Sequence, residues 1–388
     1  MTFRTTALAA SLIMAAAAMT AQAGEVGVRG ALDLGFSYTH NDDGSSFAMT
    51  SNNYVGSEIT LFGEEELNGS NKAGFVLTNG FNVDDGNFDS DPRMFNHESQ
   101  IYVKGDWGQI GMGRMSSFAT GLGTQSWYVA YDAFEAGYAD AGLQATQQTI
   151  WSRFSNSVYY TSPRFANMQL GLFYSFTGEE VDAEEQHFQD NDRYWNVALR
   201  WDTEKAGALL SFEGTERSNL NPVRYGDDIE APHSAEKDGF VMKIAARYDL
   251  GWMRVMGGYT HAEHQNDYAF GTWIANEVNR FNYIEDGEVV SASPLRKGIK
   301  SDAAHIGIQI PIGYDQINLQ YQYLDGTNED TDEDFKRHVI AAGYYKWFSP
   351  RTMLYTVAGY ADGDGVLGES ADPLSNSTNV QFGISHFF

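Results

Sequence analysis

Apolar and polar residues alternate with a period of two through most of the chain. Phe240, Met242 and Ile244, for example, share one face, while Lys243 and Arg247 lie on the other. Alternation of this kind, bounded by Gly, Asn, Asp and Ser, is typical of half-buried β-strands. Counting such segments predicts sixteen strands, and no helical period of comparable length occurs. The fold class is therefore predicted to be all-β.

The connections between the predicted strands alternate in length. Short turns are expected at residues 68–70, 105–107, 163–166, 203–206, 251, 312–313 and 349–350. Long segments rich in acids, Gly, Asn and Ser are expected near 40–53, 84–96, 178–192, 217–238, 264–301, 326–334 and 362–377. Short turns on one rim and long loops on the other are the layout of a bacterial outer-membrane barrel. We therefore expect a transmembrane antiparallel β-barrel with both termini on the short-turn side.

One connection, about 116–152, differs from the others because it is long and aromatic. Its rings are Phe118, Trp127, Tyr128, Tyr131, Phe134 and Tyr138. Loops of this length are usually functional or disordered, and disordered segments are poor in aromatic residues. The rings need a surface to pack on, and the acids among them need water. The segment is therefore predicted to fold into the water-filled interior of the barrel and to constrict it.

The first 23 residues have the features of a secretory signal peptide. Arg4 is their only charge, an apolar run spans 7–19, and Ala21-Gln22-Ala23 matches a cleavage site. The run is too short for a membrane-spanning helix, which needs about 20 residues. The domain prediction is thus a signal peptide over 1–23 and one barrel over 24–388, in the outer membrane of a Gram-negative bacterium.

Composition excludes several classes of function. The chain has no cysteine, so disulfides and thiol chemistry are absent. Its formal net charge of −27 argues against a nucleic-acid partner, which is bound through clustered Lys and Arg. No G-x-S-x-G, P-loop or comparable catalytic spacing occurs. His261 and His264 form an H-x-x-H pair, but without a third spaced ligand they do not indicate zinc.

The candidate functional residues are charges on the polar face of the strands and in the long segment. The predicted wall cations are Arg29, Arg114, Arg153, Arg200, Lys243 and Arg247, and the predicted loop acids are Asp132, Glu135 and Asp140. A charge facing lipid near the midplane costs about 2–4 kcal/mol in a barrel, so these cations are expected to face the lumen. Whether each lies at the narrowest point stays open, as does whether the acids face the wall cations or bond backbone within the loop.

Arg114 departs from the simple pattern. Alternation places it with Ile110 and Met112, toward lipid. Either a bulge at Gly113 turns it inward, or the strand has already left the membrane at that point.

Several fragments in order along the chain resemble the Gram-negative general porin family, the trimeric sixteen-stranded porins of the neisserial and Burkholderiales type. The fragments are Gly63-Glu64-Glu65-Glu66-Leu67 with Lys72-Ala73-Gly74-Phe75, Tyr102-Val103-Lys104-Gly105-Asp106-Trp107-Gly108-Gln109, Asn156-Ser157-Val158-Tyr159-Tyr160-Thr161-Ser162-Pro163, and Gly383-Ile384-Ser385-His386-Phe387-Phe388. Thr78 departs from the pattern, because the family tends to carry an acid there, and the acidic outer loops are unusually rich. Both departures leave ion selectivity open.

The resemblance implies a homotrimer that allows passive diffusion of small hydrophilic solutes and ions, without a cofactor. It also implies insertion by the barrel-assembly machinery, which recognises the terminal Phe388. Contact with outer-membrane lipids and lipopolysaccharide, bridged by divalent cations, is a separate hypothesis based on the acidic outer loops. An alternative is a substrate-specific channel in which Trp127, Tyr128 and Tyr131 form a stacking path for sugars. Two further hypotheses are an outer-membrane enzyme such as a lipase, and an adhesin acting through the exposed loops.

Overall fold

The computed structural model describes residues 25–41, 44–89, 93–120, 123–135, 137, 141–142, 153–176, 193–216, 223–225, 229–231, 237–265, 283–285, 288–290, 298–329, 332–365 and 376–388. Residues 1–23, predicted as a signal peptide, lie outside this set, as does the predicted loop 178–192. None of the helices among the described residues has the length and apolar character needed to cross a membrane.

The described chain is almost entirely strand. The strands of the main sheet are β1 (Glu25–Asn41), β2 (Gly44–Ser51), β3 (Glu58–Asn68), β4 (Asn71–Gly80), β5 (Glu98–Gly105), β6 (Gly108–Ser116), β7 (Arg153–Thr161), β8 (Met168–Ser175), β9 (Arg193–Asp202), β10 (Ala206–Glu216), β13 (Gly239–Asp249), β14 (Arg254–Gln265), β17 (Ile299–Ile312), β18 (Asp315–Asn328), β19 (Glu333–Ser349), β20 (Thr352–Gly365) and β21 (Asn376–Phe387). Two small hairpins, β11 (Val223–Tyr225) with β12 (Ile229–Ala231) and β15 (Tyr283–Glu285) with β16 (Glu288–Val290), lie outside it.

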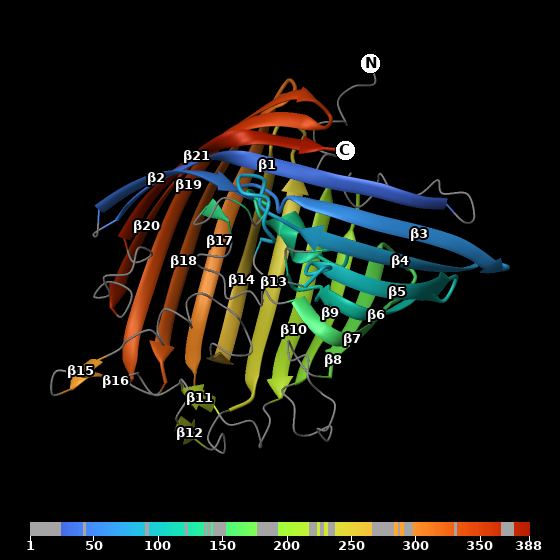
Figure 1. Cartoon of the computed structure of the whole chain (residues 1–388), viewed down its shortest axis with the longest axis horizontal. Helices are drawn as coiled ribbons and strands as arrows, with labels where there is room; N and C mark the ends of the chain where they lie inside the picture. Colours follow the sequence, from blue (N-terminus) through green and yellow to red (C-terminus); the bar gives the residue numbers. More distant parts are fainter. Residues whose placement is uncertain are drawn as a thin grey trace.

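The main sheet closes into an antiparallel barrel (Figure 1). Its first strand pairs with its last, from Ala31 opposite Phe387 to Asn41 opposite Ser377. The sheet has seventeen strands, but β2 and β3 follow one another along the same edge of β1, so the wall has sixteen strand positions. The predicted fold class and strand number are confirmed. All seven predicted short turns join consecutive strands.

The two faces of the wall differ as the alternation predicts. On β18, Leu319 and Tyr321 are 41% and 42% exposed, whereas Asn318, Gln320 and Gln322 between them are buried. Figure 1 shows the wall curving around an interior. Since neighbouring side chains point to opposite faces of a strand, the exposed apolar set forms the outer surface and the buried polar set points inward.

One of the predicted long loops is wrong, and another is shorter than predicted. Residues 44–51, expected in the loop near 40–53, form β2 and pair with β1. Phe47 of β2 stacks on Phe36 of β1 with ring centroids 5.5 Å apart, so the outer apolar row continues into the hairpin. The loop near 326–334 is likewise reduced to residues 329–332, because β18 and β19 stay paired as far as Asn328 and Glu333.

Candidate functional site

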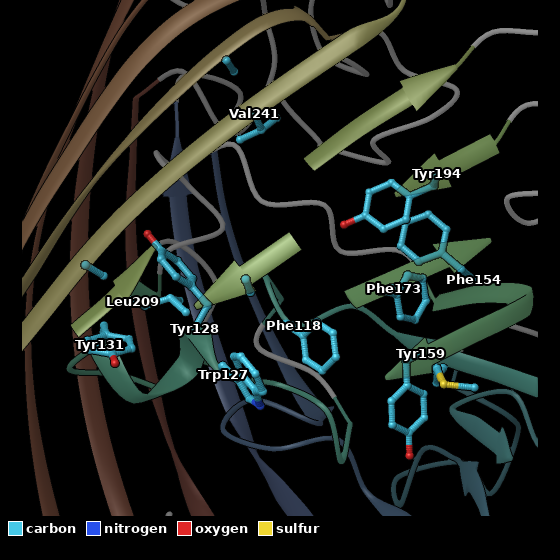
Figure 2. Close-up of a cluster of buried hydrophobic side chains, with 14 residues drawn as sticks. Phe118, Trp127, Tyr128, Tyr131, Phe154, Tyr159, Phe173, Tyr194, Leu209 and Val241 are labelled. Atoms are coloured by element: carbon cyan, nitrogen blue, oxygen red, sulfur yellow. The ribbon is translucent and has the colours of Figure 1, made fainter. Parts of the chain in front are cut away.

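The 117–142 segment leaves the end of β6, and its described residues contact the buried face of the wall. Phe118 is fully buried and packs on Trp127 with ring centroids 4.5 Å apart. Figure 2 shows Phe118 between Trp127 and Tyr159, whose ring it meets edge-on. Gly171 of β8 makes this approach possible, because a Cβ there would lie 2.7 Å from Phe118 and 2.8 Å from Trp127.

A buried ion pair holds the start of the segment. Lys243 Nζ of β13 lies 2.9 Å from Glu213 Oε1 of β10, and both side chains are 0% exposed. Lys243 Nζ also donates to the carbonyl of Ala119 at 3.0 Å. The Tyr194 hydroxyl donates to Glu213 at 2.8 Å and lies 2.9 Å from Ser117 Oγ. Lys243, predicted as a pore charge, is thus covered by the segment and neutralised by Glu213.

The next part of the segment is the single turn of 3-10 helix η2 (Tyr128–Tyr131). Three wall cations lie over its rings and over the ring before it: Arg200 at 4.3 Å from Trp127, Lys243 at 5.1 Å from Tyr128, and Arg247 at 5.7 Å from Tyr131. Cation–π contacts of this kind strengthen when they are removed from water. The Tyr131 carbonyl is also hydrogen-bonded to His305 Nε2 of β17 at 2.7 Å.

Side-chain amides of β17 and β18 hold the backbone of the segment at Ala133. Gln320 Oε1 accepts the Ala133 N–H at 3.0 Å, and Gln309 Nε2 donates to the Ala133 carbonyl at 3.1 Å. Asn318 Nδ2 donates to the same carbonyl. These buried amides are neutral, so this attachment adds no charge to the interior.

Asp132 and Gln322 extend the same attachment. Asp132 is 1% exposed, and its Oδ1 accepts from the Phe134 N–H at 3.0 Å and from Gln320 Nε2 at 2.9 Å. Gln322 Nε2 donates to the carbonyl of Gly142 at 2.9 Å. Of the two alternatives open for Asp132, the bond to backbone within the loop is present. Asp140 lies outside the described residues.

Glu135 meets a tyrosine that comes from the opposite end of the sequence. The Tyr54 hydroxyl donates to Glu135 Oε2. Burial raises the pKa of Tyr54 well above its ordinary value, and the nearby Glu135 carboxylate raises it further, so Tyr54 stays protonated and keeps donating. Gly137 packs against this tyrosine, since a Cβ there would lie 2.3 Å from the Tyr54 carbonyl.

Tyr54 is presented by residues 52–57, where the chain interrupts the pairing along β1. Asp33 of β1 fixes this interruption, because its Oδ1 accepts the N–H groups of Asn53 at 2.7 Å and Tyr54 at 3.3 Å. The Tyr355 hydroxyl also donates to it at 3.2 Å. A carboxylate that satisfies several donors fixes a buried polar turn. The 117–142 segment is therefore bonded to β9 and β13 near its start and to residues 52–57 further along.

Three arginines gather near the segment, Arg200 on β9, Arg247 on β13 and Arg254 on β14. Arg247 lies 2.9 Å and Arg200 3.9 Å from the carboxylate of Asp202. Arg254 of β14 interacts electrostatically with both Arg247 and Glu135. The loop acid Glu135 is thus brought near a wall arginine, but that arginine is Arg254, which is not among the predicted residues.

Arg29 and Arg153 belong to other parts of the wall. Arg29 is half-buried with its guanidinium 5.4 Å from the Phe62 ring. Arg153 interacts electrostatically with His97. The two arginines extend from β1 and β7, on a different part of the wall from β9 and β13, which carry Arg200, Lys243 and Arg247.

A bulge is present at Gly113, where the pairing of β6 with β7 shifts register and φ reaches +139°. It places Met115 on the buried face. Arg114 donates to the carbonyls of Asn96 at 2.9 Å and Arg153 at 2.8 Å. Its guanidinium is thereby engaged with main-chain oxygens.

Comparison with known proteins places this architecture in a family. The model of Gram-negative porins matches residues 5–366. The chain belongs to the Gram-negative porin family. An outer membrane porin of Bordetella pertussis is 28% identical over 373 residues, covering 92% of this chain and 87% of its own. Outer membrane porin protein 32 of Delftia acidovorans is 23% identical over 403 residues, covering 98% and 99%.

Solved porins share the fold. The anion-selective porin from Comamonas acidovorans has a TM-score of 0.67 at 21% identity, covering 94% of this chain and 99% of its own. The in-vitro folded OmpT of Vibrio cholerae, described as a trimer form, has a TM-score of 0.59 at 14% identity, covering 95% and 100%. The porin described here is therefore an outer-membrane channel for passive diffusion, and its relatives are channels rather than enzymes.

The predicted sugar-stacking path receives no support in this porin. Trp127, Tyr128 and Tyr131 are only 5%, 1% and 1% exposed. Their ring faces are covered by wall cations, and the rings pack in the cluster of Figure 2. These aromatic residues hold the segment to the wall and present no free face to a passing sugar.

The H-x-x-H pair is divided between separate carboxylates. His261 Nδ1 lies 2.8 Å from Asp302, and His264 Nδ1 lies 2.6 Å from Glu329. Among the residues that the structure describes, no group of three or more His, Cys, Asp or Glu side chains is arranged to hold a metal ion.

Sequence reasoning missed Arg254, Tyr54 and the amides of β17 and β18. The alternation along β14 could have indicated that Arg254 faces inward, because it lies on the same face of the strand as the buried Met256. Gln320 carried the same signal opposite Leu319. Tyr54 had none, because its inward position depends on the hydrogen bonds to Asp33, which join residues distant in sequence.

Proposed function

We propose that the 117–142 segment is the constriction of this porin and sets which small hydrophilic solutes and ions pass. The observation that carries the proposal is the two-sided attachment of the segment. Lys243 binds it to the β13 wall, and Tyr54 binds Glu135 from residues 52–57. A segment bonded to separate parts of the wall reduces the open cross-section of the lumen.

The charges of the proposed constriction divide into two groups. Lys243 and Asp132 are buried and bonded, and we assign them to holding the segment. The water-facing field is assigned to Arg29, Arg153, Arg200 and Arg247 on the wall and to Glu135 on the segment. Charged rings of this kind select ions in channels. Arg114 and Asp140 belong to the proposed constriction on sequence grounds alone.

Shortening the segment tests the constriction. Residues 121–147 are replaced by a short Gly-Ser linker, and single-channel conductance is measured in planar bilayers. Conductance is expected to rise, because the obstacle in the lumen is removed while the barrel pairing is untouched. A matched deletion of 180–189, in a predicted outer loop, serves as the control and is expected to leave conductance near wild type. Unchanged conductance in a folded 121–147 variant would show that the segment is not the constriction.

We propose further that the porin is a homotrimer, and that the wall of short strands faces the partner subunits. β5 and β8 have eight residues each, whereas β19 has seventeen. Eight residues tilted by about 45° span roughly 19 Å, less than the apolar band of about 25 Å. A neighbouring subunit would cover the part of the apolar band that these short strands do not span.

Chemical cross-linking tests this arrangement. Ile101 of β5 and Ile340 of β19 are 58% and 60% exposed. The chain has no cysteine of its own. A bifunctional maleimide is expected to join subunits through I101C and to leave I340C monomeric on a denaturing gel. Equal cross-linking of the two variants would refute the placement of the interface.

The remaining assignments concern export and the membrane environment. We propose cleavage after Ala23, so that the mature chain starts at Gly24; the intact mass of protein from outer membranes tests this. Insertion is assigned to the barrel-assembly machinery acting on Phe388. Lipopolysaccharide is the proposed lipid partner around the outer loops, and retention of labelled lipopolysaccharide by the purified protein would test it.

A further inference from the structure

Residues 52–57, which carry Tyr54, are bonded to the seam where the barrel closes. The seam is the pairing of β1 with β21, and β20 pairs with the other edge of β21 (Figure 1). Gln381 Nε2 of β21 donates to Asn53 Oδ1 at 3.0 Å, and Asn53 Nδ2 donates to the Tyr355 hydroxyl of β20 at 3.1 Å. These contacts join side chains 328 and 302 positions apart in the sequence. A turn near the start of the chain therefore depends on the last two strands.

Asp33 of β1 is the centre of this attachment. Its side chain is fully buried, and Ser385 Oγ of β21 donates to its Oδ2. Its Oδ1 accepts the N–H groups of Asn53 and Tyr54 at 2.7 Å and 3.3 Å. The Asp33 N–H in turn donates to Ser57 Oγ at 2.9 Å. One buried carboxylate thus joins the last strand of the barrel to the turn that carries Tyr54.

Tyr54 connects the seam to the 117–142 segment. Its hydroxyl donates to Glu135, and its ring centroid lies 6.3 Å from that of Tyr345 on β19. Ala141 of the segment is 1% exposed, and it belongs with Tyr355 to the buried cluster against which Tyr54 packs. Residues of the segment and of the strands beside the seam therefore share one buried cluster.

We propose that three seam residues, Asp33, Gln381 and Ser385, are positioning residues for the constriction. They act through Tyr54, which they hold within reach of Glu135. In a chain whose first and last strands have not yet paired, the contacts from β20 and β21 to the turn that carries Tyr54 are absent. The narrowing of the channel is therefore completed only when the barrel closes. The inference rests on the proposed constriction and adds the residues that place it.

Thiol labelling of A141C tests the proposal, since the chain has no cysteine of its own. Q381L removes the bond to Asn53. Maleimide labelling of A141C in outer membranes should then be about fivefold faster, the change in population that follows the loss of one buried neutral hydrogen bond. The matched control is N379L, on the same strand. Asn379 bonds two hydroxyls of β1 across the same seam, so this variant should label at the rate of A141C alone.

A second measurement separates positioning from a general loss of stability. In the Tyr54→Phe background the bond to Glu135 is already missing, so Q381L should change the labelling rate by less than about twofold. Fully additive effects of the two substitutions would show that Gln381 does not act through Tyr54. Should Q381L fail to insert into the membrane, S385A replaces it with the same expected direction, because it removes a donor to Asp33.

The order of closure is measured by refolding A141C into detergent micelles. Thiol protection should appear with, or after, the faster-migrating closed barrel on an unheated gel. Protection that precedes closure would overturn the proposal, and so would labelling of Q381L at the rate of N379L. The proposed function is read separately, because unchanged conductance after removal of residues 121–147 contradicts the constriction, whereas labelling of A141C still reports whether the seam positions the segment.

Discussion

Replacing Lys243 by Met should release the start of the 117–142 segment. Lys243 and Glu213 are 2.9 Å apart and fully buried. At an effective dielectric of about 20, two unit charges at this distance attract by about 6 kcal/mol. Removing both charges from water costs several kcal/mol per ion, so the net contribution of the pair is small. Removing one partner is different, because it leaves Glu213 uncompensated and costs about 3–5 kcal/mol.

The cost should fall on the segment rather than on the barrel. The Lys243 side chain bonds the Ala119 carbonyl at 3.0 Å, whereas the backbone of β13 stays paired with β10 and β14. A penalty of 3 kcal/mol raises the population of a locally opened state about 100-fold, since 1.4 kcal/mol is a factor of ten. The opening is favoured because it lets water solvate the Glu213 carboxylate, which has lost its partner charge.

Cysteine labelling measures this population. Thr120 is 0% exposed, and T120C would carry the only thiol of the chain. In K243M, maleimide labelling of T120C in outer membranes should be about 100-fold faster than in the wild-type background. The double variant K243M/E213Q, which removes both charges, should recover most of the protection. Labelling of K243M at the wild-type rate, or of the double variant at the K243M rate, would refute the role given to the ion pair.

Two further predictions concern the C-terminal Phe388 and the Tyr54 anchor. Deleting Phe388 removes its paired hydrogen bonds with Gly30 (3.0 and 3.1 Å), and the yield of heat-resistant trimer in outer membranes should fall; normal yield would contradict this. Tyr54→Phe removes the donor to Glu135 and should increase open-channel current noise, whereas Tyr38→Phe, on the outer face, should not. Equal noise in the two variants would exclude an anchoring role for Tyr54.

The strand pattern could be predicted because the two faces of the wall have different surroundings. On β18, Leu319 and Tyr321 are exposed on the outer face, while Gln320 between them is buried. The short turns were predictable for a related reason, since a turn such as that at Gly251 (φ +89°) needs a residue that tolerates positive φ. Local chemistry decides both features.

Parity gives the face of a side chain but says nothing about what covers it. Lys243 and Arg247 have the same parity on β13, so the sequence predicts the same inward orientation for both. The structure covers Lys243 with the segment and leaves Arg247 partly exposed beside Asp202. The interruption at residues 52–57 was also beyond prediction, because it depends on hydrogen bonds between Asp33 and residues twenty positions away.

The groups that fix the segment to the wall are largely different from the groups expected to select ions. Its start depends on an ion pair that cancels within the wall, and Ala133 is held by neutral amides of β17 and β18. Neither anchor contributes net charge to the lumen. We expect the field along the channel to include groups that do not hold the segment, such as Arg254, and these can change without loosening it. Glu135 has both tasks, because the Tyr54 hydroxyl bonds its carboxylate. Arg200 and Arg247 share both tasks, since they also lie over Trp127 and Tyr131. Ion selectivity and the position of the segment should consequently be coupled at Glu135 and independent at Arg254.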